Sequence, residues 1–203
     1  MHDLWQRLCP KSAEKDAWNG LFAELQRRYR EPHRAYHNLQ HIEEMTSLLV
    51  MHEKRMIDPF TVMMAAFFHD AVLVPGAKDN EDKSAVLAIE LLTPFATSTE
   101  LGRIANLIRE TARHAPDPSD PDLCIFIDAD LAILAASPDR FREYERGVRK
   151  EYSHVPNILY KIGRKKFLFR MAQRTSIFLD SELKSQLEEP ARKNLATAIG
   201  NMP

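Results

Sequence analysis

One apolar stretch constrains the fold of this chain more than any other. Nine almost wholly apolar residues, 60–68, run directly into the adjacent pair His69 and Asp70. Such a run is typical of a buried helix, with Pro59 in its first turn and Asp58 as its cap. A buried carboxylate beside an imidazole must be paired, hydrogen-bonded or bound to a metal, because an unpaired buried charge costs several kcal/mol. The pair therefore indicates either a structural hydrogen bond at a helix end or a functional site.

Most of the remaining chain has apolar residues at steps of three and four, which predicts amphipathic helices. These helices are expected at about 12–30, 39–49, 84–92, 101–114, 141–155, 157–174 and 188–200. The last is expected to begin at the sequence Glu188-Glu189-Pro190, because proline is favoured in a first turn. The apolar run that begins at Leu123 could contain a short strand by propensity, but no neighbouring segment offers a partner.

Composition limits the class of protein. The chain has 203 residues, of which 44% are apolar and 28% charged, and its formal net charge is −1. These values predict one folded domain, 1–203, with no general attraction to nucleic acid. No apolar run reaches the ~18 residues of a membrane helix, and the amino terminus lacks the apolar region of a signal peptide, so a cytoplasmic protein without a membrane partner is expected. Cys9 and Cys124 are too few for a disulfide framework.

A second stretch rich in histidine lies upstream, in the segment 34–42. Asn38 can cap the helix that follows it, which places His41 in the first turn of that helix. His37 then precedes the helix, so the two histidines need not share a face although they are four residues apart. His37 could equally serve in capping or packing, and a His-x-x-x-His pair alone is a weak metal signal.

Further candidate residues come later in the chain. Asp128 and Asp130 interrupt an apolar run, and on a helix their side chains would diverge by about 200°, so only one would face a given site. If the run is extended, both would share a face. Glu81 lies just before a predicted helix, where it could face either water or the His69-Asp70 pair. His114 could act as a cation at a helix end or contact a ligand.

Basic residues gather in the segment 157–174. They are expected to form a solvated helix face: Arg164, Lys165, Lys166 and Arg170.

The polar residues together indicate metal chemistry. The sequence has no glycine-rich dinucleotide or phosphate loop and no Gly-x-Ser-x-Gly elbow. His41, His69, Asp70 and one of Asp128 or Asp130 form a set of two nitrogens and two oxygens that suits a divalent ion with positions left for water and substrate. Such an ion lowers the pKa of bound water and polarises a phosphoryl oxygen, so hydrolysis is the natural reaction.

These motifs carry a resemblance to a known family. His41, then His69-Asp70, then Asp130 resemble the His…His-Asp…Asp pattern of the HD superfamily of metal-dependent phosphohydrolases. The segments 36–42, 68–70, 80–85 and 128–131 together are similar to a predicted HD phosphohydrolase group of about this length. The resemblance implies an all-α, single-domain helical bundle with a central metal site. Its metal core would cover roughly 34–131, and carboxyl-terminal helices at 138–200 would pack on it.

The resemblance also implies roles for individual residues. The implied metal ligands are His41, His69, Asp70 and Asp130. Asp130 is preferred over Asp128 because Ala129-Asp130-Leu131 matches the family's last aspartate, which leaves Asp128 and His37 as outer residues that support the ligands.

Three further residues are implied for catalysis. By analogy with other members, Glu81 would activate water and Lys83 would bind phosphate. His114 is the histidine available between the His-Asp pair and the last aspartate, either for phosphate or for a second ion.

The expected protein is an enzyme that hydrolyses a phosphate ester of a small molecule, such as a nucleotide, with metal-activated water. Its cofactor would be a divalent ion: Mn, Co, Ni, Zn, Fe or Mg. The alternative is a non-catalytic regulatory HD protein that binds a metal and a ligand. Oxygenase chemistry with a pair of irons would need more ligands than the sequence supplies.

Overall fold

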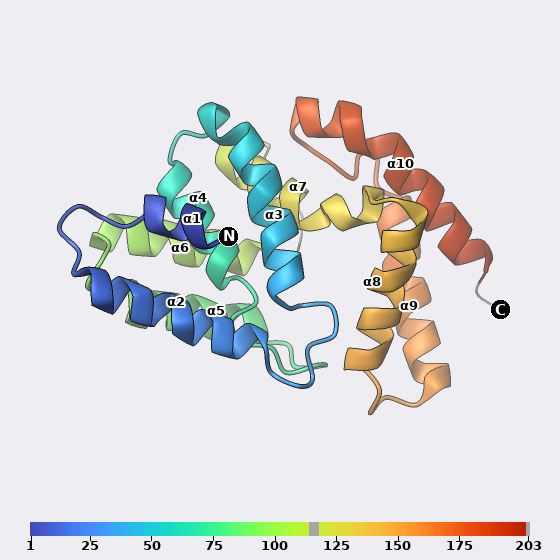
Figure 1. Ribbon diagram of the computed structural model, residues 1–203. Coiled ribbons are helices and arrows are strands. Elements are labelled where there is room, and N and C mark those ends of the chain that lie inside the picture. Colours follow the sequence, from blue (N-terminus) through green and yellow to red (C-terminus); the bar gives the residue numbers. More distant parts are fainter. Residues whose placement is uncertain (114–117, 202–203) are drawn as a thin grey trace.

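The computed structural model describes residues 1–113 and 118–201, and within them every regular element is a helix, which confirms the all-α fold class. Figure 1 shows their arrangement. The α-helices are α1 (His2–Arg7), α2 (Lys15–Tyr29), α3 (Leu39–His52), α4 (Pro59–Phe68), α5 (Asn80–Leu92), α6 (Ser98–Glu110), α7 (Pro121–Leu131), α8 (Pro138–Glu151), α9 (Asn157–Ala172) and α10 (Ser181–Gly200). Two short 3-10 helices, η1 (Glu53–Arg55) and η2 (Ala132–Ala135), follow α3 and α7.

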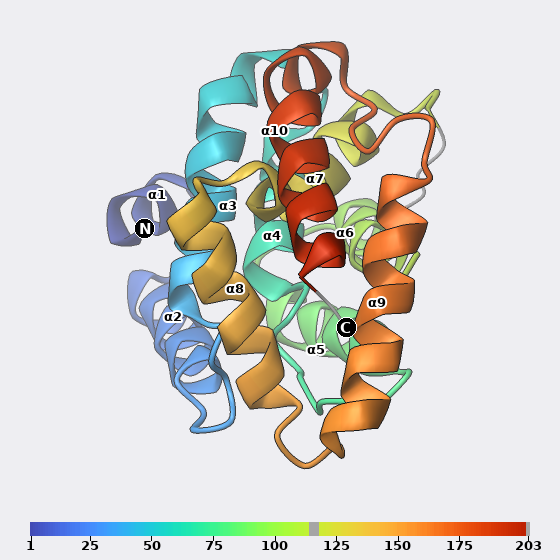
Figure 2. The same ribbon diagram turned by 90° about the vertical axis from the view of Figure 1, so that its right-hand side faces the viewer.

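Helix α4 lies at the centre of the fold. Every residue from Thr61 to Phe68 is buried, and the helix packs against α3, α5, α6 and α7. Helices α8, α9 and α10 lie together on one side of this group, with α10 packed on α9 and on η2 (Figures 1 and 2). The buried apolar residues form one cluster that extends from α1 to α10.

Helix caps place the predicted ligands as the sequence indicates. The side chain of Asp58 accepts a hydrogen bond from the Thr61 amide at 3.2 Å, and Pro59 opens α4. Asn38 caps α3 by accepting from the Gln40 amide at 2.9 Å. These caps fix the start of each helix, so the first turn of α3 and the end of α4 meet in a defined register.

Several predicted boundaries are wrong. Helix α5 begins at Asn80 rather than at position 84, so Glu81 lies in its first turn. Helix α10 begins at Ser181, because the Asp180 carboxylate accepts from two amides of its first turn, and Pro190 lies inside it. Apolar residues buried on both sides of Pro190 hold that helix together despite the lost backbone hydrogen bond.

Two further differences concern the segments that contain the predicted site residues Asp128, Asp130 and His114. The run after Leu123 is helical, as α7, and forms no strand. Helix α6 ends at Glu110 instead of continuing to His114, which lies outside the described residues. No helix in the described part of the chain combines the length and apolar character needed to cross a membrane.

Candidate metal centre

Four predicted ligands converge from three helix ends. His41 comes from the first turn of α3, His69 and Asp70 follow α4, and Asp130 lies near the end of α7. The Nε2 atoms of His41 and His69 are 3.2 Å apart. Oδ1 of Asp130 lies 3.3 Å from the first nitrogen and 3.6 Å from the second, and Oδ2 of Asp70 lies 3.7 and 3.0 Å from them. His41, His69 and Asp130 thus form a group that could hold a metal ion.

The spacing of these atoms fits one divalent ion. Ligand atoms 2.0–2.2 Å from an ion lie about 2.8–3.6 Å apart at octahedral or tetrahedral angles. The five distances given above range from 3.0 to 3.7 Å. Small shifts of the side chains would therefore bring His41, His69 and Asp130 to bonding distance of one centre, with Asp70 beside His69.

The hydrogen bonds of the two histidines orient their Nε2 atoms as ligands. Nδ1 of His69 lies 3.0 Å from the carbonyl oxygen of Ala66, which can only accept, so Nδ1 carries a hydrogen and Nε2 is the atom directed at the cluster. Nδ1 of His41 contacts the hydroxyl of Tyr36 at 3.2 Å. Since the two Nε2 atoms and two carboxylates face one another, protons or a cation must lie between them.

The pKa values of His69 and Asp70 are shifted by the charges that meet at this cluster. Burial lowers the pKa of His69, but the charges of Asp70 and Asp130 outweigh burial and raise it well above its usual value. Burial raises the pKa of Asp70, but the nearby imidazoles His69 and His37 outweigh it and hold that pKa well below its usual range. The carboxylates of the cluster therefore stabilise a positive charge placed beside them.

The segment after α4 is held by the side chain of Arg34. This guanidinium is fully buried and donates to the carbonyl oxygens of Asp70 at 2.7 Å, Ala71 at 3.1 Å and His37 at 3.1 Å. One side chain thus joins the loop before α3 to the turn after α4 and keeps the ligands of both segments in register.

Helix α8 fixes the loop before α3 from the other side. The buried carboxylate of Glu151 accepts from the amides of Ala35, Tyr36 and His37 at 2.7–2.9 Å, and from Nδ1 of His37 at 2.7 Å. One turn earlier, a Cβ on Gly147 would lie 3.0 Å from Cβ of Tyr36 and 3.2 Å from the carbonyl oxygen of Ala35. Glycine at this position therefore permits the close approach that the hydrogen bonds of Glu151 require.

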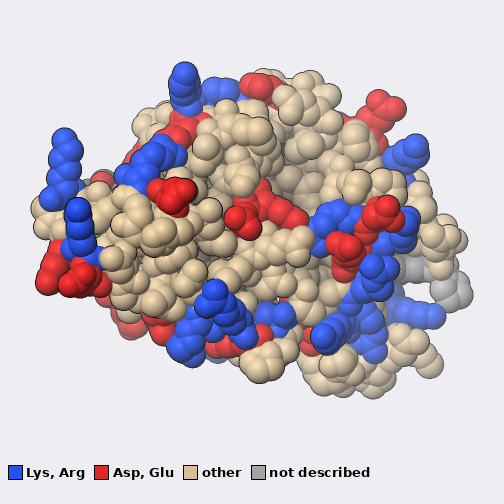
Figure 3. Space-filling model, in the orientation of Figure 1, with Lys and Arg blue, Asp and Glu red and all other residues tan. Residues whose placement is uncertain are grey.

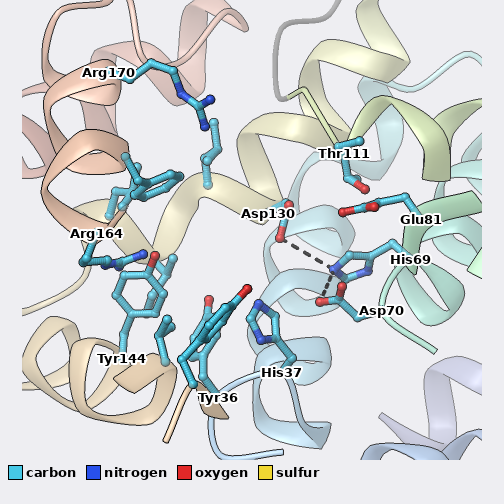
Figure 4. A pocket seen from close by; sticks show the side chains of 17 residues that line it. Tyr36, His37, His69, Asp70, Glu81, Thr111, Asp130, Tyr144, Arg164 and Arg170 are labelled. Atoms are coloured by element: carbon cyan, nitrogen blue, oxygen red, sulfur yellow. Dashed lines mark ion pairs between the residues drawn. The ribbon is translucent and has the colours of Figure 1, made fainter. Parts of the chain in front are cut away.

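The cluster opens into a cavity of about 370 Å³, which is the size of a small-molecule site. His37, His69, Asp70, Glu81 and Asp130 line it. Figure 4 shows the carboxylate of Glu81 directed into the cavity from the same side as His69. The structure therefore brings Glu81 and His37 to the predicted ligands.

Two other predicted site residues lie elsewhere. The half-exposed side chain of Lys83 pairs with Asp79 at 2.9 Å and does not line the cavity, because position 83 lies on an outer face of α5. Its predicted phosphate contact therefore gains no support.

Asp128 faces away from the ligands and forms its hydrogen bonds elsewhere. Its predicted role in supporting the ligands therefore gains no support. Its carboxylate accepts from the amides of Leu179 and Asp180 at 2.7–3.0 Å, immediately before α10. Burial raises the pKa of Asp128 to about 7, although these backbone hydrogen bonds lower it. The divergence of two side chains two positions apart on a helix explains why Asp130 alone joins the histidines.

The sequence-based prediction of a solvated basic face is wrong at Arg164. Its side chain is 9% exposed, pairs with Glu145 and lines the cavity. Arg170 also lines the cavity, and Tyr36 and Tyr144 form part of its wall. On the surface, Lys and Arg side chains gather where α8 and α9 lie (Figure 3). The three-residue spacing of Arg164, Phe167 and Arg170 on α9 was the signal that these side chains share a face.

A scan against protein-family models found no matching family, and searches of curated proteins and of solved structures found no similar protein.

Proposed function

We propose that the protein is a metal-dependent phosphohydrolase that cleaves a phosphate ester of a small molecule. The observation that carries the proposal is the convergence of His41, His69, Asp70 and Asp130 at one end of a cavity of small-molecule size. Two imidazole nitrogens and two carboxylate oxygens suit a borderline or hard divalent ion, such as manganese, cobalt, nickel, zinc, iron or magnesium.

A divalent ion held by these four residues would supply a water of lowered pKa and polarise a phosphoryl oxygen. Glu81 is directed into the cavity beside His69, which suits it to accept the proton of the attacking water (Figure 4). His37 lines the cavity with its Nδ1 atom held by Glu151, so its Nε2 atom is suited to hydrogen-bond the leaving oxygen. Glu81 and His37 thus provide a proton acceptor and a hydrogen-bonding group beside the cluster.

Phosphate release from a panel of phosphate esters, nucleotides included, tests this function. The protein would be assayed with added Mn²⁺, Co²⁺, Ni²⁺ or Mg²⁺, beside the variants His69→Ala and Glu81→Gln. We expect metal-dependent release from at least one ester, its loss in His69→Ala, and a lower kcat with retained metal in Glu81→Gln. Exposed Glu143→Gln is the control and should keep full activity.

A metal-loaded protein that releases no phosphate from any ester would contradict hydrolysis. If that protein still bound one of the esters, the result would support the regulatory alternative, in which the same site binds metal and ligand without turnover.

A further inference from the structure

The cavity has two ends of opposite charge. Asp70, Glu81 and Asp130 lie at the end that holds the histidines. Arg164 and Arg170 reach the cavity from α9, on the side opposite His69 and Asp70 (Figure 4). Tyrosine and phenylalanine side chains form part of the wall: Tyr36, Tyr144, Tyr152 and Phe167.

Arg164 is held in a fixed position at the basic end. Its Nε atom donates to Glu145 Oε1 at 3.1 Å, and Nη2 donates to the same oxygen. Its guanidinium lies 4.7 Å from the ring centre of Tyr144 and 4.8 Å from that of Phe167. Because a guanidinium has five N–H donors, an ion pair with one carboxylate oxygen does not exhaust its capacity to bind an anion.

Arg170 adds a charge that no carboxylate balances among the described residues. It lies six positions after Arg164, and both line the same cavity together with Phe167 between them. In the described part of the chain, no Asp or Glu oxygen lies within 4.0 Å of its guanidinium, and its aromatic neighbour is Phe167 at 5.8 Å. An anion from solution or from a ligand could therefore form with Arg170 the ion pair that no described carboxylate forms.

On these grounds, and resting on the proposed function, we propose that the substrate carries two anionic groups. The phosphoryl group to be hydrolysed lies at the metal cluster, and the second anionic group binds Arg164 and Arg170. A cavity of about 370 Å³ exceeds what a single phosphoryl group needs. The planar fork of arginine matches the oxygens of phosphate or carboxylate, and the aromatic wall suits the organic part between the two anions.

Binding of synthetic bisphosphates tests the inference without requiring turnover. The probes are straight-chain alkanediol bisphosphates and the alkanol monophosphates of the same length, titrated into Mn²⁺-loaded protein by calorimetry. We expect the best-fitting bisphosphate to bind about 10- to 100-fold more tightly than its monophosphate, as charged hydrogen bonds of 1.5–3 kcal/mol imply.

The variant Arg170→Gln should remove most of this advantage and leave monophosphate affinity within about two-fold. Arg170 is chosen because it is exposed, whereas a change at Arg164 would leave Glu145 without its partner. Lys166→Gln, an equal charge change at an exposed position of α9 outside the cavity, is the matched control and should keep the full advantage.

Two results would overturn the inference. Bisphosphates and monophosphates could bind equally at every chain length. Alternatively, Arg170→Gln could weaken both classes to the same extent, which would mean that the arginine and the metal hold one phosphoryl group. An advantage that depends on Arg170 in a protein that releases no phosphate would uphold the second anion site while contradicting hydrolysis.

Discussion

Replacing Glu151 with glutamine tests how α8 holds the loop that precedes α3. The side chain of Glu151 is fully buried. Its Oε1 atom accepts from the amides of Ala35 at 2.9 Å, Tyr36 at 2.7 Å and His37 at 2.9 Å, and its Oε2 atom contacts Nδ1 of His37 at 2.7 Å. Glutamine has nearly the same shape, but it lacks the charge and replaces one acceptor with a donor.

The expected loss follows from these four contacts. A hydrogen bond to a charged group contributes about 1.5–3 kcal/mol, and a neutral one about 1 kcal/mol. Since glutamine can still accept from the three amides, we expect the free energy of unfolding to fall by about 2–4 kcal/mol. For a chain of this size, such a loss lowers Tm by roughly 4–16 °C.

The contribution of Glu151 should also depend on pH. Burial raises the pKa of this carboxyl, but hydrogen bonds from His37 and the backbone outweigh burial, so the pKa lies below its usual value. A carboxylate with a lowered pKa stabilises the fold above its unfolded pKa of about 4.3, and this stabilisation is lost as pH falls through the folded pKa. The difference between wild type and Glu151→Gln should therefore be largest near neutral pH and shrink in acid.

Urea denaturation at pH 7 and at acid pH measures both effects. Glu143→Gln, on the same helix with a side chain 54% exposed, is the control and should stay within about 0.5 kcal/mol of wild type. If Glu151→Gln also stayed within that range at pH 7, or if its deficit did not change with pH, the carboxylate would not hold the loop as described.

Three further predictions concern close packing, the two aspartates and the metal. Gly147→Ala should lower the free energy of unfolding by about 1–3 kcal/mol because its Cβ has no space, whereas Gly102→Ala, at a helical position with open space, should be neutral or stabilising in urea denaturation. Elemental analysis should find metal lost from Asp130→Ala and retained in Asp128→Ala. The second variant should instead lose about 1–3 kcal/mol because two backbone amides before α10 lose their acceptor. The reverse pattern would mean that the wrong aspartate was chosen. Chelation should lower Tm because the ligands come from three separate segments, and an unchanged melting curve after verified metal removal would show that the helices hold the site without it.

The sequence predicted the ligand cluster because its signals are local. An apolar run that ends in His69-Asp70, a capping Asn38 three residues before His41, and an aspartate inside a buried helix are each visible within about ten residues. Helical geometry then predicts that only one of Asp128 and Asp130 faces the histidines, without deciding which. Charge and periodicity were therefore enough to name His41, His69 and Asp70, whereas the choice of Asp130 over Asp128 came from the resemblance to the HD pattern.

The residues that support the cluster could not be predicted because their partners are distant in sequence. Glu151 is more than a hundred positions from the loop that it holds, and nothing near Gly147 in the sequence indicates a close contact with Tyr36. Arg164 appeared to belong to a solvated face because neighbouring positions are also basic, and only its contacts with Glu145 and Tyr144 of α8 show that it is buried. Lys83 was expected at the site by analogy with other HD proteins, but side chains two positions apart on a helix, such as Glu81 and Lys83, point in different directions.

Metal content of the purified protein tests the central claim most directly. Elemental analysis by mass spectrometry should find about one divalent transition metal per chain in the wild type and almost none in His69→Ala or Asp70→Ala, since loss of a ligand should cost at least the ~10–100-fold in affinity seen for outer residues. Circular dichroism would establish that the variants are folded. Full metal occupancy in a folded Asp70→Ala variant, or a wild type that binds no divalent ion at any concentration tested, would contradict the assignment of this cluster as a metal centre.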